Sequence, residues 1–256
     1  MVRILSFLAF LLFSIFTNAQ VSENRTVGDF SKLKVSTGID LTFTQDTKTT
    51  VKVEADDAEK LQDIVTKVSG STLEVFVDSK NYNKNDKKNK KRNNHKILRV
   101  YVTAPFVDSF QASSSGSITA KNEISVKNAD VKVSSSGSFN GNIKAEDIIM
   151  KASSSGDIKG QIIAKNLDID LSSSGDATLS GTSENISISA SSSADFEGKN
   201  LTVKTASVQA SSSADVTLNV TESLKAKASS SASITYSGTP AKVEAEKSSS
   251  GSVNHK

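Results

Sequence analysis

Four aspartates recur at a nearly constant spacing in the second half of this 256-residue chain: Asp157, Asp176, Asp195 and Asp215. If the segments between them stack as equivalent units, their carboxylates form a row about 4.8 Å apart, where like charges destabilise a sheet. A bound cation would relieve that repulsion, and calcium prefers such hard oxygen ligands. Proton uptake or screening by water would relieve it too, and the calcium-binding nonapeptide repeat of β-helices is absent. The row is therefore a candidate calcium site, and a solvated row of turn residues is the simpler interpretation.

Each of these aspartates directly follows a four-residue word, three serines and then Gly or Ala. The word occurs eight times, and its copies begin at Ser113, Ser134, Ser153, Ser172, Ser191, Ser211, Ser229 and Ser248. The differences between successive starting positions, 21, 19, 19, 19, 20, 18 and 19, are almost constant. A period of roughly 20 residues is typical of solenoids, in which each repeat stacks on its neighbour.

Apolar residues alternate on both sides of each word, as at Val131, Val133 and Phe139. Strict alternation predicts half-buried strands, and its parity continues through the word. We therefore expect an extended chain there, with the middle Ser and the Gly or Ala pointing inward and the first and third Ser outward. Because three words end in Ala, which tolerates positive φ poorly, the last position is predicted to require small size.

Two strand stretches per repeat, each stacked in parallel on its equivalents, predict an all-β fold. The expected architecture is a single-stranded parallel β-helix of about 19 residues per coil, wound right-handed. Residues 111–256 would form its eight coils, and residues 20–110 an N-terminal capping part that covers the open end.

Within the cap, alternating apolar residues predict strands in residues 30–44, 50–53, 72–77 and 97–103. Residues 56–67 are predicted to form a short helix, because Leu61, Ile64, Val65 and Val68 have helical spacing.

Residues 1–19 have the pattern of a signal peptide. Arg3 precedes an apolar run over residues 4–16, and Thr17-Asn18-Ala19 is a small-residue cleavage site. No later segment is long and apolar enough to span a membrane, so no transmembrane segment is expected in the mature chain. These features predict an exported protein of the periplasm, the outer-membrane surface or the medium. The chain has no cysteine, which excludes disulfides, thiolate metal sites and a cysteine nucleophile.

The net charge of +3 conceals one basic segment, since residues 80–96 hold eight Lys or Arg and one Asp. Such a segment cannot bury apolar surface, so a solvated loop is the default expectation. The functional alternative is an anion-binding patch for lipopolysaccharide, polysaccharide or nucleic acid, formed by Lys87, Lys88, Lys90, Lys91 and Arg92. Tyr82 is the sole aromatic in the segment, which disfavours specific nucleic-acid recognition.

Enzymatic interpretations fit poorly. The two histidines, His95 and His255, lie in the basic segment and beside the C-terminus, and no Gly-x-Ser-x-Gly elbow is present. A lyase can work with Asp, Lys and Arg alone, but it would need a coil that breaks the pattern. The outward serine rows could also bind glycans, although the aromatic platforms for sugars are scarce, with no Trp and three Tyr. No enzyme activity and no cofactor other than calcium are expected.

The opening of the mature chain carries a family resemblance. Residues 30–45, FSKLKVSTGIDLTFTQ, resemble the start of the "putative autotransporter adhesin, head GIN domain" family, with Gly38-Ile39-Asp40 at the name-giving triplet. Val51-Lys52-Val53-Glu54-Ala55-Asp56 and Leu73-Glu74-Val75 fit it too, and the resemblance covers residues 27–252. It implies a β-helix of short coils with serine-glycine turns, without the catalytic residues of pectin-lyase-like folds, and a role in cell adhesion in Gram-negative bacteria.

These observations predict a non-catalytic exported adhesion or cell-envelope scaffold module. Its expected partners are a host or neighbouring cell surface, matrix or polysaccharide. The alternative is a carbohydrate-binding or carbohydrate-active, lyase-like protein that uses the Asp-bearing face. Turnover of uronate polymers would distinguish the alternative from plain adhesion. A regulatory envelope protein is a third possibility, because a signal peptide does not say what is bound.

Overall fold

The computed structural model describes residues 21–78 and 97–256. The predicted signal peptide and the basic segment, with its candidate patch of Lys87, Lys88, Lys90, Lys91 and Arg92, lie outside the described residues. No helix in the described part of the chain is long and apolar enough to cross a membrane.

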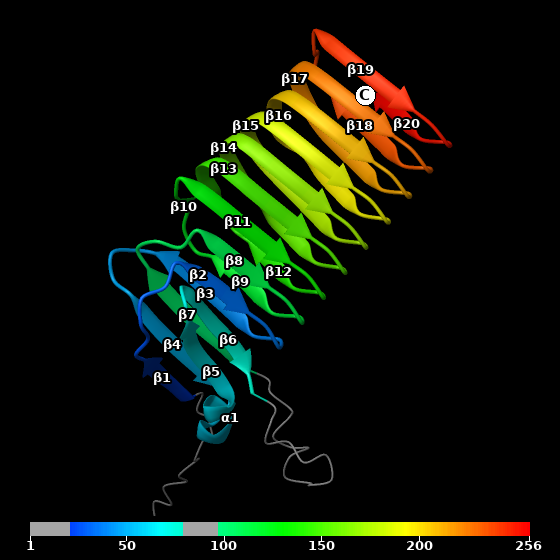
Figure 1. Ribbon diagram of the computed structural model, residues 1–256. Coiled ribbons are helices and arrows are strands. Elements are labelled where there is room, and N and C mark those ends of the chain that lie inside the picture. The colour runs from blue at the N-terminus through cyan, green and yellow to red at the C-terminus, as the bar shows by residue number, and fades with distance from the viewer. Residues whose placement is uncertain (1–20, 79–96) are drawn as a thin grey trace, which may run out of the picture.

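The described strands wind into an elongated rod of stacked coils (Figure 1). In each coil, one stretch of strand leads into the serine word and another leaves it. Each stretch pairs in parallel with its equivalents in the neighbouring coils. Asp157 lies opposite Asp176, and Asp176 opposite Asp195, so the strand register repeats with the period of the serine words. The prediction of an all-β parallel solenoid, with one coil for each repeat of the sequence, is confirmed.

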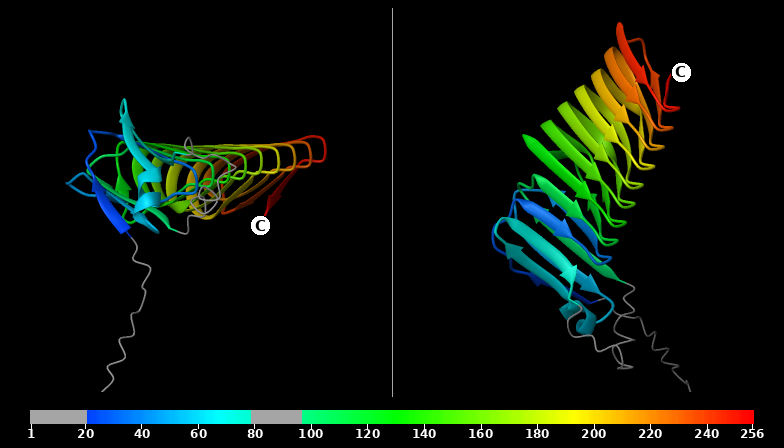
Figure 2. Two further views of the ribbon diagram at one scale, coloured as in Figure 1. Left: turned by 90° about the horizontal axis from the view of Figure 1, so that it is seen from below. Right: turned by 45° about the vertical axis from the view of Figure 1, so that its right-hand side comes forward.

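The rod has two faces, and seen from below its coils overlie one another as a narrow, flattened loop (Figure 2). Strands that lead into the turns form the pre-turn face: β6 (Thr72–Val77), β2 (Lys32–Val35), β8 (Ser109–Ala112), β11 (Asn128–Val133) and β19 (Lys242–Lys247). Strands that leave them form the post-turn face: β7 (Leu98–Ala104), β3 (Asp40–Gln45), β9 (Ser117–Ala120), β12 (Ser138–Asn140), β18 (Ser233–Ser237) and β20 (Ser252–His255). Four long strands run through both faces: β14 (Asp157–Leu171), β15 (Asp176–Ala190), β16 (Asp195–Ala210) and β17 (Asp215–Ala228).

The end of each coil opposite the serine turns, residues 161–166 and their equivalents, is called the far end below. It includes β10 (Ile124–Ser125) and the start of β13 (Ile143–Ala152). The core between the faces is one continuous apolar cluster. Near the N-terminal end it holds three phenylalanine rings in contact, edge to face for Phe43 and Phe110 (centroids 5.3 Å apart) and tilted for Phe110 and Phe139 (5.5 Å).

The serine word is a tight turn, so the predicted extended chain is wrong. The middle and third serines have positive φ, for example 50° at Ser154 and 60° at Ser155. The Gly156 N–H donates to the Ser153 carbonyl at 3.0 Å, which completes the features of a type I′ turn. Both of these serines are exposed, whereas the middle one was predicted to point inward, and the first is half-buried.

The prediction for the last position of the word is confirmed. No Gly or Ala at this position has positive φ. Gly116, Gly137, Gly156 and Gly175 are buried, as are the alanines of the three later words. A Cβ at Gly175 would lie 2.4 Å from the Ala152 carbonyl oxygen of the preceding coil. The last residue of the word must therefore be small, because the backbone of the preceding coil lies directly against it. The left-handed conformation belongs instead to the middle and third serines.

Additional strands and one helix cover the N-terminal end of the rod. β1 (Val21–Arg25) and β7 pair antiparallel with β4 (Thr50–Ala55), and β5 (Ile64–Ser69) pairs antiparallel with β6. Helix α1 (Ala58–Asp63) starts where the Asp57 side chain accepts from the Lys60 N–H at 2.8 Å. The helix ends before the predicted residue 67, since the β-branched run from Ile64 to Thr66 enters the β5–β6 hairpin instead.

Candidate functional site: the serine edge and the polar post-turn face

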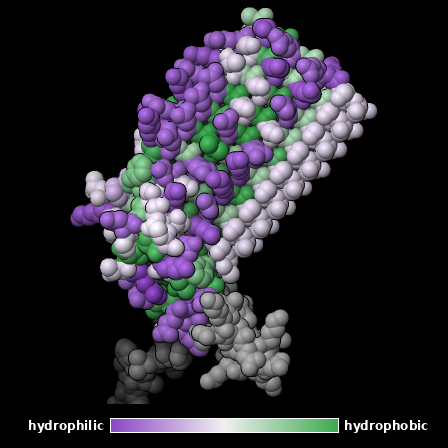
Figure 3. Space-filling model, viewed as in Figure 1, coloured by the Kyte–Doolittle hydropathy of each residue, from purple (hydrophilic) through white to green (hydrophobic). Residues whose placement is uncertain are grey.

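The serine turns stack into a continuous edge held by the main chain. In seven successive pairs of coils the third serine donates its N–H to the carbonyl of the middle serine in the next coil, at 3.0–3.1 Å, as Ser155 does to Ser173. Left-handed backbone costs about 1–2 kcal/mol per residue, and each net hydrogen bond returns about 0.5–1.5 kcal/mol. Figure 3 shows the result as a pale, regular band along one edge of the rod.

A ninth turn of this kind lies in the head, the N-terminal residues 20–110, where the sequence has no serine word. Thr37 and Gly38 have φ of 63° and 69°, and the Gly38 N–H donates to the Ser114 carbonyl at 3.0 Å. Ile39 is fully buried at the position that Gly or Ala occupies elsewhere. The triplet Gly38-Ile39-Asp40 thus completes the first turn of the stack and begins β3. Its sequence signal is the Val-Ser-Thr-Gly-Ile-Asp pattern, which keeps the alternation of the later coils.

The four aspartates lie in register on the post-turn face, as their spacing predicts. Asp157, Asp176, Asp195 and Asp215 are direct cross-strand neighbours on β14 to β17. Burial, and then the nearby carboxylates of Asp176, Asp215 and Glu197, raise the pKa of Asp195 above its usual range. At Asp157 a lysine offsets the repulsion between the carboxylates, because Lys159 Nζ lies 2.7 Å from Asp157 Oδ2.

A metal role for this row stays a prediction. In the described ranges, 21–78 and 97–256, no group of three or more His, Cys, Asp or Glu side chains converges in a way that could hold a metal ion. A straight row offers each cation carboxylates from one side only, and calcium takes six to eight oxygen ligands.

At the far end the main chain also pairs from coil to coil, as Ile163 does with Thr182, and side chains add further contacts. Asn166 donates to Asp147 Oδ1 at 2.7 Å, and Asn185 donates to Asn166 Oδ1 at 3.0 Å. The residues just before this amide row alternate in charge along the rod: Lys127, Glu146, Lys165, Glu184, Lys204 and Glu222. Lys204 Nζ lies 3.5 Å from Glu184 Oε1. These contacts link neighbouring coils and engage the amide, carboxylate and amine groups that form them.

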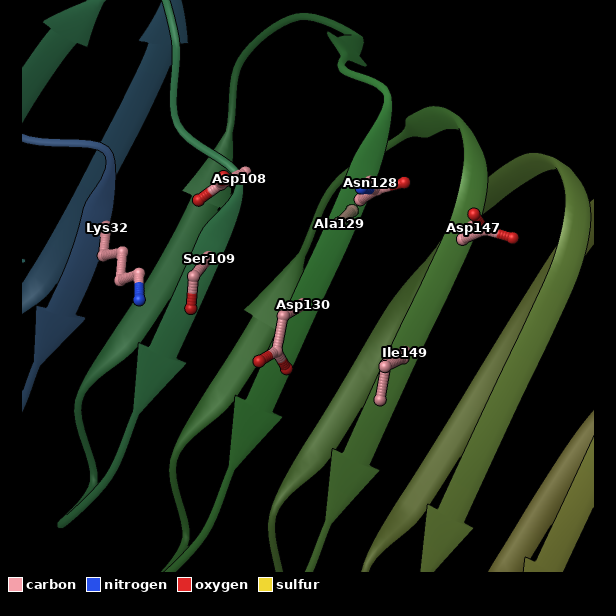
Figure 4. Close-up of a pocket in the computed structure, with 8 residues that line it drawn as sticks. All are labelled: Lys32, Asp108, Ser109, Asn128, Ala129, Asp130, Asp147 and Ile149. Carbon is pink, nitrogen blue, oxygen red and sulfur yellow. The ribbon is translucent and has the colours of Figure 1, made fainter.

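A hollow of about 450 Å³ lies on the pre-turn face near the head (Figure 4). It is lined by Lys32, Asp108, Ser109, Asn128, Ala129, Asp130, Asp147 and Ile149. Asp130 is paired with Lys132 at 2.6 Å, and one shielded oxygen each of Asp108 and Asp130 has no hydrogen-bond partner in the described part of the chain. Ser109 is the one hydroxyl of this lining, and Lys32 and Asp130 are its cross-strand neighbours.

A second hollow, of about 480 Å³, lies on the post-turn face beside the aspartate row and is called the polar groove here. Its lining comes from four consecutive coils: Asn142, Lys159, Gly160, Gln161, Thr178, Leu179, Ser180, Glu197 and Asn200. The strand register shifts at this place, between Thr178 and Ser180 of β15 and between Gly198 and Thr202 of β16. Bulges of this kind are over-represented next to functional sites.

The sequence carries a signal for this groove in the spacing of the serine words. The steps from word to word are 20 before Ser211 and 18 after it, so both coils depart from the common length of 19, as does the first coil with its step of 21. Glu197 pairs with Thr178 and Asn200 with Ser180, so the coil of β16 has one residue more than that of β15 in this stretch. The coils are therefore not all alike, in contrast to the expectation from the sequence.

Of the two histidines, His255 is the one that lies within the described residues. Its ring packs on Tyr236, with centroids 4.9 Å apart, and its Nε2 lies 2.9 Å from the Gly238 carbonyl oxygen. These contacts join the C-terminal strand β20 to β18 and to the residue that follows it.

The stacked parallel coils and the serine edge define the chain as a β-solenoid protein. The chain belongs to the family described as "Putative auto-transporter adhesin, head GIN domain", whose model matches residues 29–162 and 140–240. The resemblance seen in residues 30–45 is thus confirmed.

Solved structures show the same fold. A "putative lipid binding protein" from Parabacteroides distasonis is 21% identical, with a TM-score of 0.80 over 93% of this chain and 96% of that one. A "putative adhesin" from the same species is 17% identical, with a TM-score of 0.82 over 93% and 97%. A "putative adhesin" from Parabacteroides merdae is 15% identical, with a TM-score of 0.81 over 93% and 96%. No curated protein matches the chain.

Proposed function

We propose that this protein is a non-catalytic exported adhesion or cell-envelope scaffold module. The observation that carries the proposal is the serine edge, a main-chain ladder that runs through all the coils and makes the rod a regular polar surface. A solenoid of this kind offers an extended face on which many weak contacts add up. The membership in a family described as adhesins supports the same conclusion.

The proposed partners are a host or neighbouring cell surface, matrix or polysaccharide. The proposed location is the periplasm, the outer-membrane surface or the medium, in a Gram-negative cell, after cleavage of a signal peptide of residues 1–19. Specific recognition of nucleic acid is not part of the proposal. Of the two histidines, the described one, His255, contacts an aromatic ring and a carbonyl, which supports a role without catalysis.

Cell fractionation with surface proteolysis tests this function. Protease added to intact cells should degrade the protein, and purified protein coated on beads should attach the beads to cells or matrix. Protection of the protein in intact cells would contradict surface adhesion and favour a periplasmic scaffold. Turnover of alginate or another uronate polymer by the purified protein would contradict the non-catalytic role.

A further inference from the structure

The polar groove is a two-column array of side chains on three neighbouring strands. Lys159, Thr178 and Glu197 form one column across β14, β15 and β16. Gln161, Ser180 and Asn200 form the next column toward the far end. Strand spacing makes each column about 10 Å long, and two residues along a strand separate the columns by about 7 Å. The array therefore has the dimensions of one or two sugar rings.

Most of the hydrogen-bonding groups in this array are free. The side chains of Gln161, Thr178, Ser180 and Asn200 form no hydrogen bond with another described residue, and all four are at least partly exposed. Asn142 uses its Oδ1 to accept from the Gln161 N–H at 3.1 Å, which leaves its NH₂ group available. Amides and hydroxyls offer donors and acceptors side by side, which is what the vicinal hydroxyls of a sugar require.

The charge around the groove selects against anionic ligands. Glu197 lies within it, and Asp176 and Asp195 flank it on the same strands. Lys159 is held by Asp157 at 2.7 Å, so its charge is already paired. Uronates, sulfates and phosphates would therefore meet like charge, which is costly in recognition.

The lining also selects against peptides. Leu179 is the one large apolar residue of the groove, and it is only 2% exposed, as part of the floor. A peptide needs an open strand edge or apolar anchor pockets. At this place β15 is paired on both sides, with β14 and β16.

We propose that the polar groove binds a neutral polysaccharide chain through the sugar hydroxyls. This inference rests on the adhesion function proposed above and names its ligand class and site. The extra residue in the β16 coil lies between Glu197 and Asn200, two residues of the groove's lining. Without an aromatic platform, a single groove binds weakly, with a Kd of about 1 mM, and many copies on a surface multiply that affinity.

Native affinity electrophoresis suits such weak binding. The full mature chain is run in gels that contain dextran, yeast mannan, galactomannan or xyloglucan, and in a gel that contains alginate. The test variant is Gln161→Ala/Asn200→Ala, and a second variant deletes Lys199 to restore the common coil length. The matched control is Ser187→Ala/Ser207→Ala, which removes two exposed polar groups from the same strands on the pre-turn face. Thermal unfolding followed by circular dichroism checks that each variant folds.

At least one neutral polysaccharide should retard the wild type. The association constant should fall at least tenfold in Gln161→Ala/Asn200→Ala and in the Lys199 deletion, and it should be unchanged in the control. Retardation by none of the four neutral polymers, or equal retardation of the Gln161→Ala/Asn200→Ala variant, would overturn the inference. Alginate binding that depends on Gln161 and Asn200 would overturn the neutral assignment. If any of these results is found while coated beads still attach to cells, the groove is not the neutral-polysaccharide site. The adhesion function then stands without it.

Discussion

The two ends of each coil solve the same problem, a reversal of chain direction, in different ways. At the serine edge the main chain holds the turn, through left-handed serines and hydrogen bonds from each turn to the next. At the far end the chain stays paired in parallel with the neighbouring coils, and the amide row and alternating charges add side-chain contacts. The main-chain edge keeps one length in every coil, and the register shifts fall away from it. The variation in coil length, and the polar groove beside it, lie on the post-turn face and toward the far end.

The largest effect is expected from a β-branched residue at the serine edge. Ser173→Val places a branched Cβ at a φ of 50° and should lower the free energy of unfolding by about 2–3 kcal/mol. Ser173→Gly, the matched control, should change it by less than about 1 kcal/mol, since glycine adopts this φ without strain. Urea denaturation of the variants checks this, and equal stability of Val and Gly at this position would show that the turn is not left-handed.

A smaller loss is expected at the far end. Asn166→Ala removes the hydrogen bonds to Asp147 and from Asn185, both on the exposed surface, and should cost about 1 kcal/mol. Asn166→Asp keeps the acceptor but places a carboxylate beside Asp147, so it should be no more stable than the alanine variant. The same urea titrations compare the three chains. A loss as large as that of Ser173→Val would remove the distinction between the two ends.

The aspartate row makes stability depend on pH. The folded pKa of Asp195 is raised, so the folded state binds the proton more tightly than the unfolded state does. The contribution of Asp195 to stability should therefore rise as the pH falls from neutral through that raised pKa. Because the side chain is largely solvated, the gain should stay within about 0.5 kcal/mol. Asp195→Asn should be as stable at pH 7 as the wild type at lower pH, and an unchanged pH profile in this variant would contradict the assignment.

The calcium hypothesis for the row has its own test. If Asp157, Asp176, Asp195 and Asp215 bind calcium, a millimolar concentration of the ion should raise the melting temperature of the wild type and not that of Asp176→Ser. Identical melting curves with and without calcium in both chains would refute it.

The smallest effect is expected from the alternating charges. Glu184→Lys places three lysines in sequence along the far end, with Lys165 and Lys204 on either side. Both side chains of the present Glu184–Lys204 pair are about half exposed, so the loss should be about 0.5 kcal/mol. High salt should remove the difference from the wild type, since it screens exposed charges. A difference that persists in about 1 M NaCl would mean that these residues act through packing.

Much of the rod could be predicted because the same sequence pattern and the same strand pairing repeat in every coil. The spacing of the words gives the coil length, the alternation gives the strands, and together they place Asp157 beside Asp176. The turn itself was missed because serine is not a residue that signals positive φ. A single left-handed serine is unfavourable, and the stack of inter-coil hydrogen bonds that stabilises it is not visible in any one repeat.

Departures from the period were the other part that sequence reasoning could not place. The extra residue near Lys199 shows in the word spacing, yet only the strand register places it between Glu197 and Asn200, in the lining of the groove. Helical spacing at Ile64 and Val65 was overridden by pairing with β6, because tertiary contacts outweigh a short periodic signal.

Amide hydrogen exchange along the serine words tests the central claim, that a main-chain ladder builds this edge, most directly. In each word the third serine donates its N–H to the next coil, as Ser155 and Ser174 do, while the middle serine, such as Ser154 or Ser173, makes no such bond. Residue-resolved exchange measured by NMR should show slow third serines next to fast middle serines, repeated in every word through Ser231. Equally fast exchange at both positions would contradict the ladder and return the word to an open, solvated bend.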